Sequence, residues 1–279
     1  MIKNFLWTKL RARLTFIKSK AGQPYNWLFL PGGPGLGSES LANLTSCLEL
    51  PGTMWFLDFP GDGSNLIDNV DNNEYYFARW TDALVEAVSA LGNVIIVAHS
   101  TGGMYVLASP NLKKLLKGLV LMDTAPDASW QDGYLKYCKA NPLQEMDALQ
   151  KIYVNNKTVE NLKKLTLASL PSIFTPAGLS AGRLLFEKLP YNVESCEWSD
   201  KHFDKTYQTL WVPDNIPTLI FAGDQDNIVP LTYFEKSQDF QKTNIVMRRI
   251  QDAGHFPWIE KPKQVRSLFE EFLTQLVCV

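Results

Sequence analysis

Apolar residues along this chain follow two spacings, which predict alternating strands and helices. Short apolar runs, many of them β-branched or aromatic, predict buried strands over residues 27–30, 54–58, 94–98, 119–123, 218–223 and 244–250. Apolar positions three or four residues apart predict helices over residues 75–91, 101–109, 231–239 and 264–276. Residues 6–18 suggest one or two antiparallel edge strands. This alternation is typical of the α/β class, with a doubly wound, mostly parallel sheet.

The alternation stops between about residues 127 and 212. In this block the pattern predicts helices over residues 148–154, 159–170 and 180–189, separated by Pro171, Pro176 and Pro190. We therefore predict a core formed by residues 1–126 and 213–279, and a helical cap formed by residues 127–212. The cap should cover the carboxyl ends of the strands, where ligands bind in open α/β sheets. Most of its many aromatic side chains are expected to pack against the core.

The strand at residues 94–98 leads into the most informative segment. Two small residues, Ala98 and Gly102, stand two positions before and after Ser100. This spacing is typical of a nucleophile elbow, a strand-to-helix turn so tight that larger side chains at those positions would collide. Ser100 would then stand at a helix N-terminus, where amide donors favour a developing negative charge. A closely packed turn without chemistry would show the same pattern.

A serine nucleophile needs a base, and the chain has three histidines. His99 adjoins Ser100 and should point away from its hydroxyl on a sharp turn. His202 lies in the predicted cap. His255 follows the last predicted strand and a glycine, so its loop can direct the ring toward the serine. We predict that His255 is the base, with a surface-loop histidine as the alternative.

Three aspartates are candidates for the acid that orients this base. Asp226 and Asp224 follow the strand at residues 218–223, and Asp123 ends the strand at residues 119–123. Asp226 is predicted because it lies further into its loop, whereas Asp224 is better placed to cap the turn. Asp123 remains an alternative, since a carboxylate at that strand end can reach the same histidine.

A tetrahedral intermediate also needs preorganised N–H donors for its oxyanion. One donor should be Thr101, the residue after Ser100. The other should come from the glycine–proline loop at residues 31–37. The two prolines of this loop have no N–H, which leaves Gly32, Gly33 and Gly35 as donors, and Gly33 is the predicted one. This loop lacks the Gly-Lys-Ser/Thr ending of a phosphate-binding loop and the G-x-G-x-x-G spacing of a dinucleotide site.

Composition narrows the function classes further. The 279 residues are 46% hydrophobic and carry a net charge of -2, which does not favour a nucleic-acid partner or an anionic membrane surface. No apolar run approaches the roughly 18 residues of a membrane span, and we expect a cytoplasmic protein. The four cysteines are far apart, which predicts free thiols and no metal site. We expect no cofactor.

Together these motifs resemble those of the α/β-hydrolase superfamily over nearly the whole chain outside the cap. The matching segments are the elbow at residues 98–102, the glycine loop at residues 31–35, the turn at residues 58–64, the acid loop at residues 223–230 and the histidine loop at residues 254–257. The order Ser100, Asp226, His255 is also that of this superfamily. The resemblance implies an α/β-hydrolase fold with an inserted cap.

The glycine loop is also similar to the His-Gly-Gly-Pro-Gly loop of prolyl aminopeptidases, the proline iminopeptidase-like proteins. That resemblance implies release of an N-terminal residue, with cap carboxylates holding the free amine. Glu194 and Glu197 are the candidates for this role, with solvated surface glutamates as the alternative. Two residues depart from the family pattern, because Pro31 replaces the loop histidine and Thr101 replaces a tryptophan.

These observations predict a metal-independent serine hydrolase that cleaves a small ester, amide or peptide-like acyl substrate through an acyl-enzyme. A prolyl aminopeptidase and a carbon–carbon bond hydrolase are alternatives with the same reactive residues. A non-catalytic receptor for a small ligand on a hydrolase fold is the alternative from another class. The expected partner is a small molecule or short peptide, with no nucleic acid or membrane, and the oligomeric state is left open.

Overall fold

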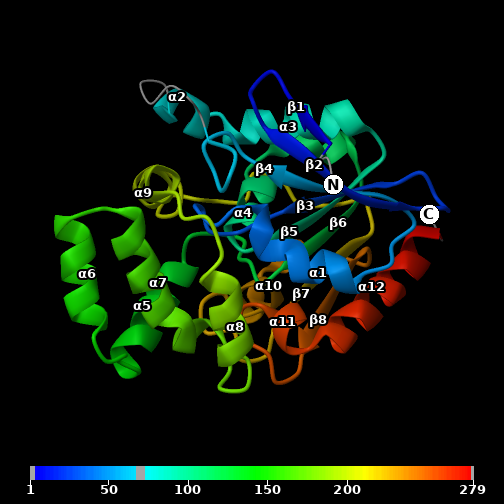
Figure 1. The fold of residues 1–279 in the computed structure, drawn as a ribbon. Coiled ribbons are helices and arrows are strands. Elements are labelled where there is room, and N and C mark those ends of the chain that lie inside the picture. Colours follow the sequence, from blue (N-terminus) through cyan, green and yellow to red (C-terminus); the bar gives the residue numbers. More distant parts are fainter. Residues whose placement is uncertain (1–3, 67–72, 278–279) are drawn as a thin grey trace.

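The computed structural model describes residues 4–66 and 73–277, and these residues form an eight-stranded sheet (Figure 1). The strand order is β1-β2-β4-β3-β5-β6-β7-β8. The strands are β1 (Phe5–Trp7), β2 (Arg13–Lys20), β3 (Asn26–Leu30), β4 (Gly52–Asp58), β5 (Val94–His99), β6 (Leu116–Met122), β7 (Thr218–Gly223) and β8 (Ile245–Ile250). β3 to β8 run parallel, while β1 and β2 are antiparallel at one edge. The predicted doubly wound, mostly parallel sheet is confirmed.

Helices pack on both faces of the sheet and enclose two hydrophobic cores. One core includes side chains of α3 (Trp80–Leu91), α4 (Thr101–Leu107) and α10 (Thr232–Lys236). The other includes side chains of α1 (Ala42–Cys47), α11 (Pro257–Glu260) and α12 (Pro262–Val277). Neighbouring residues of a strand point to opposite faces, so β5 supplies Ile96 to the first core and Ile95 to the second. A strand covered on both faces is therefore apolar at nearly every position.

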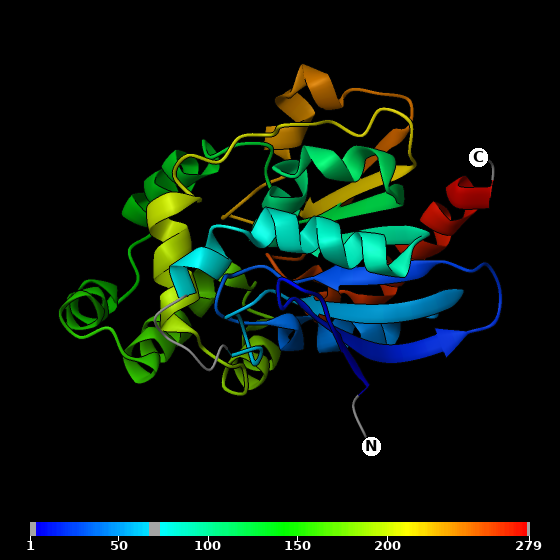
Figure 2. The ribbon, with the colours of Figure 1, turned by 90° about the horizontal axis from the view of Figure 1, so that it is seen from above.

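The chain between β6 and β7, which we call the insertion, is helical. It contains α5 (Trp130–Ala140), α6 (Met146–Asn155), α7 (Val159–Ile173), α8 (Leu179–Phe186) and α9 (Val193–His202). Figure 2 shows these helices beside one end of the sheet. At the neck of the insertion, Asp127 pairs with Gln208 in an isolated antiparallel bridge. The predicted boundaries of the cap, at residues 127 and 212, stay a prediction.

Several helix boundaries differ from the predicted ones. The helix predicted over residues 75–91 is divided into α2 (Asn73–Phe77) and α3, with Arg79 outside the helical region at φ -113°. Tertiary packing explains the break, because Trp80 stacks on Phe59 and its Nε1–H donates to the Pro60 carbonyl at 3.0 Å. The helix predicted to start at residue 231 ends at Lys236.

The helices of the insertion also differ from the predicted ones. Pro171 lies inside α7, which continues to Ile173, whereas we expected a helix end before it. A proline in the last turn removes a single backbone hydrogen bond, so the helix tolerates it there. α5 and α9 were not among the predicted helices. Short 3-10 helices complete the described elements: η1 (Ser38–Leu41), η3 (Pro110–Lys114) and η4 (Gln238–Phe240).

Candidate active site

Ser100 occupies the turn between β5 and α4. Its backbone lies at φ 50° and ψ -128°, a conformation that a residue with a side chain rarely adopts. A Cβ at Gly102 would lie 2.3 Å from the Pro31 carbonyl oxygen, so the turn leaves no room for a larger residue there. The first N–H groups of α4 have no partner within the helix. Ser100 is half-buried and directly precedes α4.

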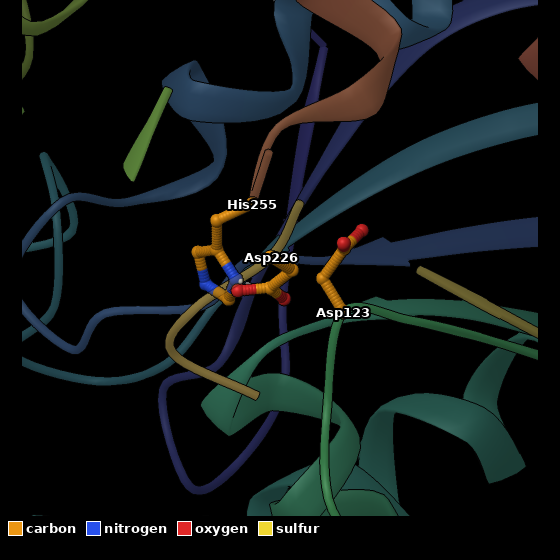
Figure 3. Close-up of side chains that lie close together, drawn as sticks. All are labelled: Asp123, Asp226 and His255. Carbon is orange, nitrogen blue, oxygen red and sulfur yellow. Dashed lines mark hydrogen bonds and ion pairs between the residues drawn. The ribbon is translucent and has the colours of Figure 1, made fainter. Parts of the chain in front are cut away.

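The structure brings Ser100, His255 and Asp226 together in a chain of hydrogen bonds. Ser100 Oγ lies 3.1 Å from His255 Nε2. His255 Nδ1 lies 2.9 Å from Asp226 Oδ2, the bond drawn in Figure 3. A carboxylate can only accept, so the ring proton belongs on Nδ1 and Nε2 is left to accept the serine O–H. The second Asp226 oxygen accepts the N–H groups of Ile228, at 2.9 Å, and Val229, at 3.2 Å. Asp226 and His255 are both buried.

The other two candidate aspartates have different partners. Asp224 Oδ1 accepts the Ala253 N–H at 3.3 Å. Asp123 Oδ1 accepts the Gly223 N–H at 2.9 Å, and its other oxygen has no hydrogen-bond partner among the described residues. Figure 3 shows Asp226 between Asp123 and His255. Burial, and then the charge of Asp226, raise the pKa of Asp123 well above its usual value, which favours a neutral carboxyl group.

Asp123, Asp226 and His255 are also the one group of three potential metal ligands found among residues 4–66 and 73–277. One ligating atom from each lies within 4.8 Å of the others. However, His255 Nδ1 and Asp226 Oδ2 are bonded to each other, and a cation held by both would have to replace that bond. The donor set therefore suits proton transfer better than metal binding.

A second buried histidine connects the serine turn with the histidine loop at residues 254–257. His99 Nε2–H donates to the backbone carbonyl of His255 at 2.9 Å. Burial, and then the neighbouring His255, lower the pKa of His99 well below its usual value. The ring of His99 therefore stays neutral and serves as a hydrogen-bond donor.

The glycine loop at residues 31–35 passes directly over the serine. A Cβ at Gly32 would lie 2.5 Å from the Ser100 Cβ. Gly33 has φ +125°, which favours glycine, and its carbonyl accepts the Thr101 hydroxyl at 3.1 Å. Gly33 and Thr101, the residue after the nucleophile, are thus in contact. Their role as oxyanion donors stays a prediction.

Two carboxylates that we did not predict connect these loops with the insertion. Glu260 accepts the N–H of Gly254 at 2.7 Å and that of Thr175 at 3.0 Å. Asp62 accepts the N–H of Gly35 at 2.6 Å and the hydroxyl of Ser195 at 3.2 Å. Burial raises the pKa of Asp62 to about 7. Asp62 belongs to the turn at residues 58–64 that the sequence motif marked, whereas no local pattern indicates Glu260.

The predicted amine-binding glutamates lie on α9, apart from this hydrogen-bond chain. Glu197 accepts the Tyr153 hydroxyl at 2.7 Å and pairs with Lys157. Glu194 and Glu197 line a hollow of about 750 Å³ whose lining does not include Ser100, Asp226 or His255. Their role in substrate binding therefore stays a prediction.

Comparisons with known proteins place the chain in a hydrolase family. A family profile described as the alpha/beta hydrolase family matches residues 27–268. No curated protein sequence matches the chain. Among the described residues, no helix is long and apolar enough to cross a membrane.

Solved structures share the fold over almost their whole length. An alpha/beta fold family hydrolase from Bacillus anthracis has a TM-score of 0.74 at 15% identity, covering 97% of this chain and 98% of its own. A proline iminopeptidase-related protein from Thermus thermophilus has a TM-score of 0.73 at 19% identity, covering 99% of each chain. A thermophilic esterase from Thermogutta terrifontis has a TM-score of 0.64 at 17% identity, again covering 99% of each chain. At these identities the similarity is one of fold.

Proposed function

Because the chain belongs to the alpha/beta hydrolase family and is therefore a hydrolase enzyme, we propose that it is a serine hydrolase acting through an acyl-enzyme. The proposed substrate is a small ester, amide or peptide-like acyl compound. The observation that carries the proposal is the hydrogen-bond chain from Ser100 through His255 to Asp226. Serine is a weak nucleophile unless a base removes its proton, and this arrangement supplies the base and its orienting acid.

In the proposed mechanism, Ser100 Oγ attacks the substrate carbonyl carbon while His255 Nε2 takes the hydroxyl proton. The carbonyl oxygen becomes an oxyanion, which the N–H groups of Gly33 and Thr101 would hold. His255 then gives its proton to the leaving group as the carbon–heteroatom bond breaks. Asp226 stabilises the imidazolium during this transfer. A water molecule, deprotonated by the same histidine, then attacks the acyl carbon. The bond between this carbon and Ser100 Oγ breaks, the acid product leaves, and His255 returns the proton to Oγ.

Labelling with a fluorophosphonate probe tests the nucleophile directly. We expect rapid covalent labelling of the wild-type protein at Ser100 and no labelling of Ser100→Ala. The turnover number (kcat) of Ser100→Ala on an ester should fall about 10⁶-fold, as for removal of a serine nucleophile elsewhere. A wild-type protein that stays unlabelled would overturn the proposal and favour a receptor on the same fold.

A prolyl aminopeptidase is the second candidate, favoured by the position of the Gly-Gly-Pro-Gly segment over Ser100. Glu194 and Glu197 would then bind the free amine. A panel of p-nitrophenyl esters assayed beside proline p-nitroanilide separates the two candidates. An aminopeptidase should prefer the proline anilide, and Glu197→Gln should raise its Michaelis constant (KM) without affecting ester cleavage.

A further inference from the structure

Each polar group of His255 has a hydrogen-bond partner within the described residues, and one partner belongs to the insertion. The ring bonds to Ser100 and Asp226, and the carbonyl oxygen accepts from His99. The backbone N–H donates to the carbonyl of Ile173, at the end of α7, at 2.8 Å. The position of the imidazole is therefore set partly by the core and partly by the insertion.

Glu260 reinforces this contact from the last residue of α11. Its Oε2 accepts the N–H of Gly254, the residue before His255, at 2.7 Å. Its Oε1 accepts both the N–H of Thr175, at 3.0 Å, and the Thr175 hydroxyl, at 2.5 Å. One carboxylate thus joins the histidine loop to the segment of residues 173–175, at the end of α7.

The backbones of these two segments approach so closely that side chains are excluded between them. A Cβ at Gly254 would lie 2.4 Å from the Ile173 carbonyl oxygen. Beside this contact, the rings of Phe174 and Phe256 stack with centroids 5.4 Å apart. The apolar contact and the carboxylate bridge hold the same two segments together, so neither segment can shift without the other.

We propose that Glu260 is a positioning residue for His255, and that it orients the base through the docked segment of residues 173–175. The inference rests on the proposed serine hydrolase function, because it assigns His255 as the base. Proton transfer from Ser100 depends on the 3.1 Å separation of Oγ and Nε2 and on its direction. Releasing Gly254 and Thr175 would let the histidine loop move away from the serine.

The test compares Glu260→Gln with wild type by the rate constant of fluorophosphonate labelling and by the kcat and KM of ester cleavage. Glutamine keeps the shape of the side chain but offers one oxygen acceptor, so one of the three donors loses its partner. We expect labelling and kcat to fall about tenfold, as for loss of a hydrogen bond to a charged group. KM should stay unchanged, because substrate binding does not depend on the base.

Two further variants separate positioning from general damage. Thr175→Val removes the hydroxyl donor and keeps the backbone bond, and it should slow labelling about two- to fivefold. Glu271→Gln removes a carboxylate that pairs with Arg248 on the surface of α12, and it should label at the wild-type rate. Thermal unfolding of all variants identifies any that fail to fold. If Glu260→Gln does not fold, the labelling rate of Thr175→Val tests the inference in its place.

The outcomes distinguish this inference from the proposed function. A wild-type protein that is not labelled at Ser100 refutes the function and the inference with it. Labelling of Glu260→Gln at the wild-type rate refutes the inference alone, as does an effect confined to KM. A wild-type rate for Thr175→Val would show that the bond from the Thr175 hydroxyl to Glu260 does not contribute to the position of His255.

Discussion

The histidine loop and the glycine loop both contact Ser100 and both are bound to the insertion through a carboxylate, but in different surroundings. Glu260, at the histidine loop, is half-buried and bridges two backbone segments. Asp62, at the glycine loop, is fully buried between Gly35 and Ser195. The comparison indicates that the insertion binds both loops beside Ser100. The contact at the glycine loop should depend more strongly on pH.

The largest expected effect separates the role of Asp226, which bonds to the ring of His255, from that of Asp62, which binds the glycine loop. Asp226→Asn should lower kcat about 10⁴-fold, because an amide in place of the carboxylate favours the wrong histidine tautomer. The same change at Asp62 alters a loop contact and leaves the base intact, so its activity should remain far above that of Asp226→Asn. Steady-state ester assays of the two variants at pH 8 provide the measurement. Similar losses in both would contradict the division of roles.

The hydrogen-bond chain from Ser100 through His255 to Asp226 was predictable because of where parallel strands end. β5, β7 and β8 end at the same edge of the sheet, so Ser100, Asp226 and His255 were expected to meet there although they are far apart along the chain. Small residues around the serine added a local steric signal. Short-range patterns and sheet topology together were sufficient for this part of the structure.

The contacts of the insertion were not predictable in the same way. Nothing in the local pattern shows that Glu260 meets Thr175, which is 85 residues away, or that Asp62 meets Ser195, which is 133 residues away. The division of the helix predicted over residues 75–91 has a related cause, because the packing of Trp80 outweighs helical periodicity. Such contacts depend on three-dimensional packing that hydrophobic spacing does not encode.

A substitution at Gly35 should disturb the contact between the glycine loop and the insertion. A Cβ there would lie 2.8 Å from the Asn192 carbonyl oxygen, and φ +100° disfavours any residue except glycine. Gly35→Ala should therefore displace the loop and its Gly33 N–H. Loss of one oxyanion donor lowers kcat about 10²- to 10³-fold, which ester assays would detect.

Gly92→Ala is the matched control for that prediction. Gly92 also has a positive φ, +65°, but no atom lies within 4 Å of the position of its Cβ. It should therefore lose stability through backbone strain, about 1–3 kcal/mol, while keeping the wild-type kcat. Equal losses of kcat in both variants would show that strain alone explains the effect at Gly35.

The pH dependence of the free energy of unfolding should distinguish the contact at the glycine loop from that at the histidine loop. The pKa of Asp62 is raised from 3.8 to about 7 in the folded protein. Between these values the folded state retains a proton that the unfolded chain has lost. The contribution of Asp62 to the stability of the folded state is therefore complete below pH 3.8 and disappears as pH rises through about 7.

Asp62→Asn cannot titrate at this position, so it should gain stability relative to wild type as pH rises. The free energy of unfolding of the variant minus that of wild type should increase by a few kcal/mol between pH 4 and pH 8, on the order of 1.4 kcal/mol for each unit of pKa shift. Urea denaturation at several pH values measures this difference. The subtraction also removes most of the contribution of Asp58, a second buried carboxyl with a raised pKa. A difference independent of pH would contradict the assignment.

The smallest expected effect comes from Ser195, whose hydroxyl donates to Asp62 from α9. This bond lowers the pKa of Asp62 against the larger effect of burial, so Ser195→Ala should raise that pKa further. The variant should lose about 1 kcal/mol of stability above pH 7, where the carboxylate is ionised, and less below pH 5. Urea denaturation at pH 5 and pH 8 would measure this dependence. Fluorophosphonate labelling should continue at the wild-type rate, because Ser195 has no bond to the histidine loop, whereas Thr175→Val slows it. A slower labelling rate in Ser195→Ala would mean that α9 also orients the base, and the two loops would then share one contact with the insertion.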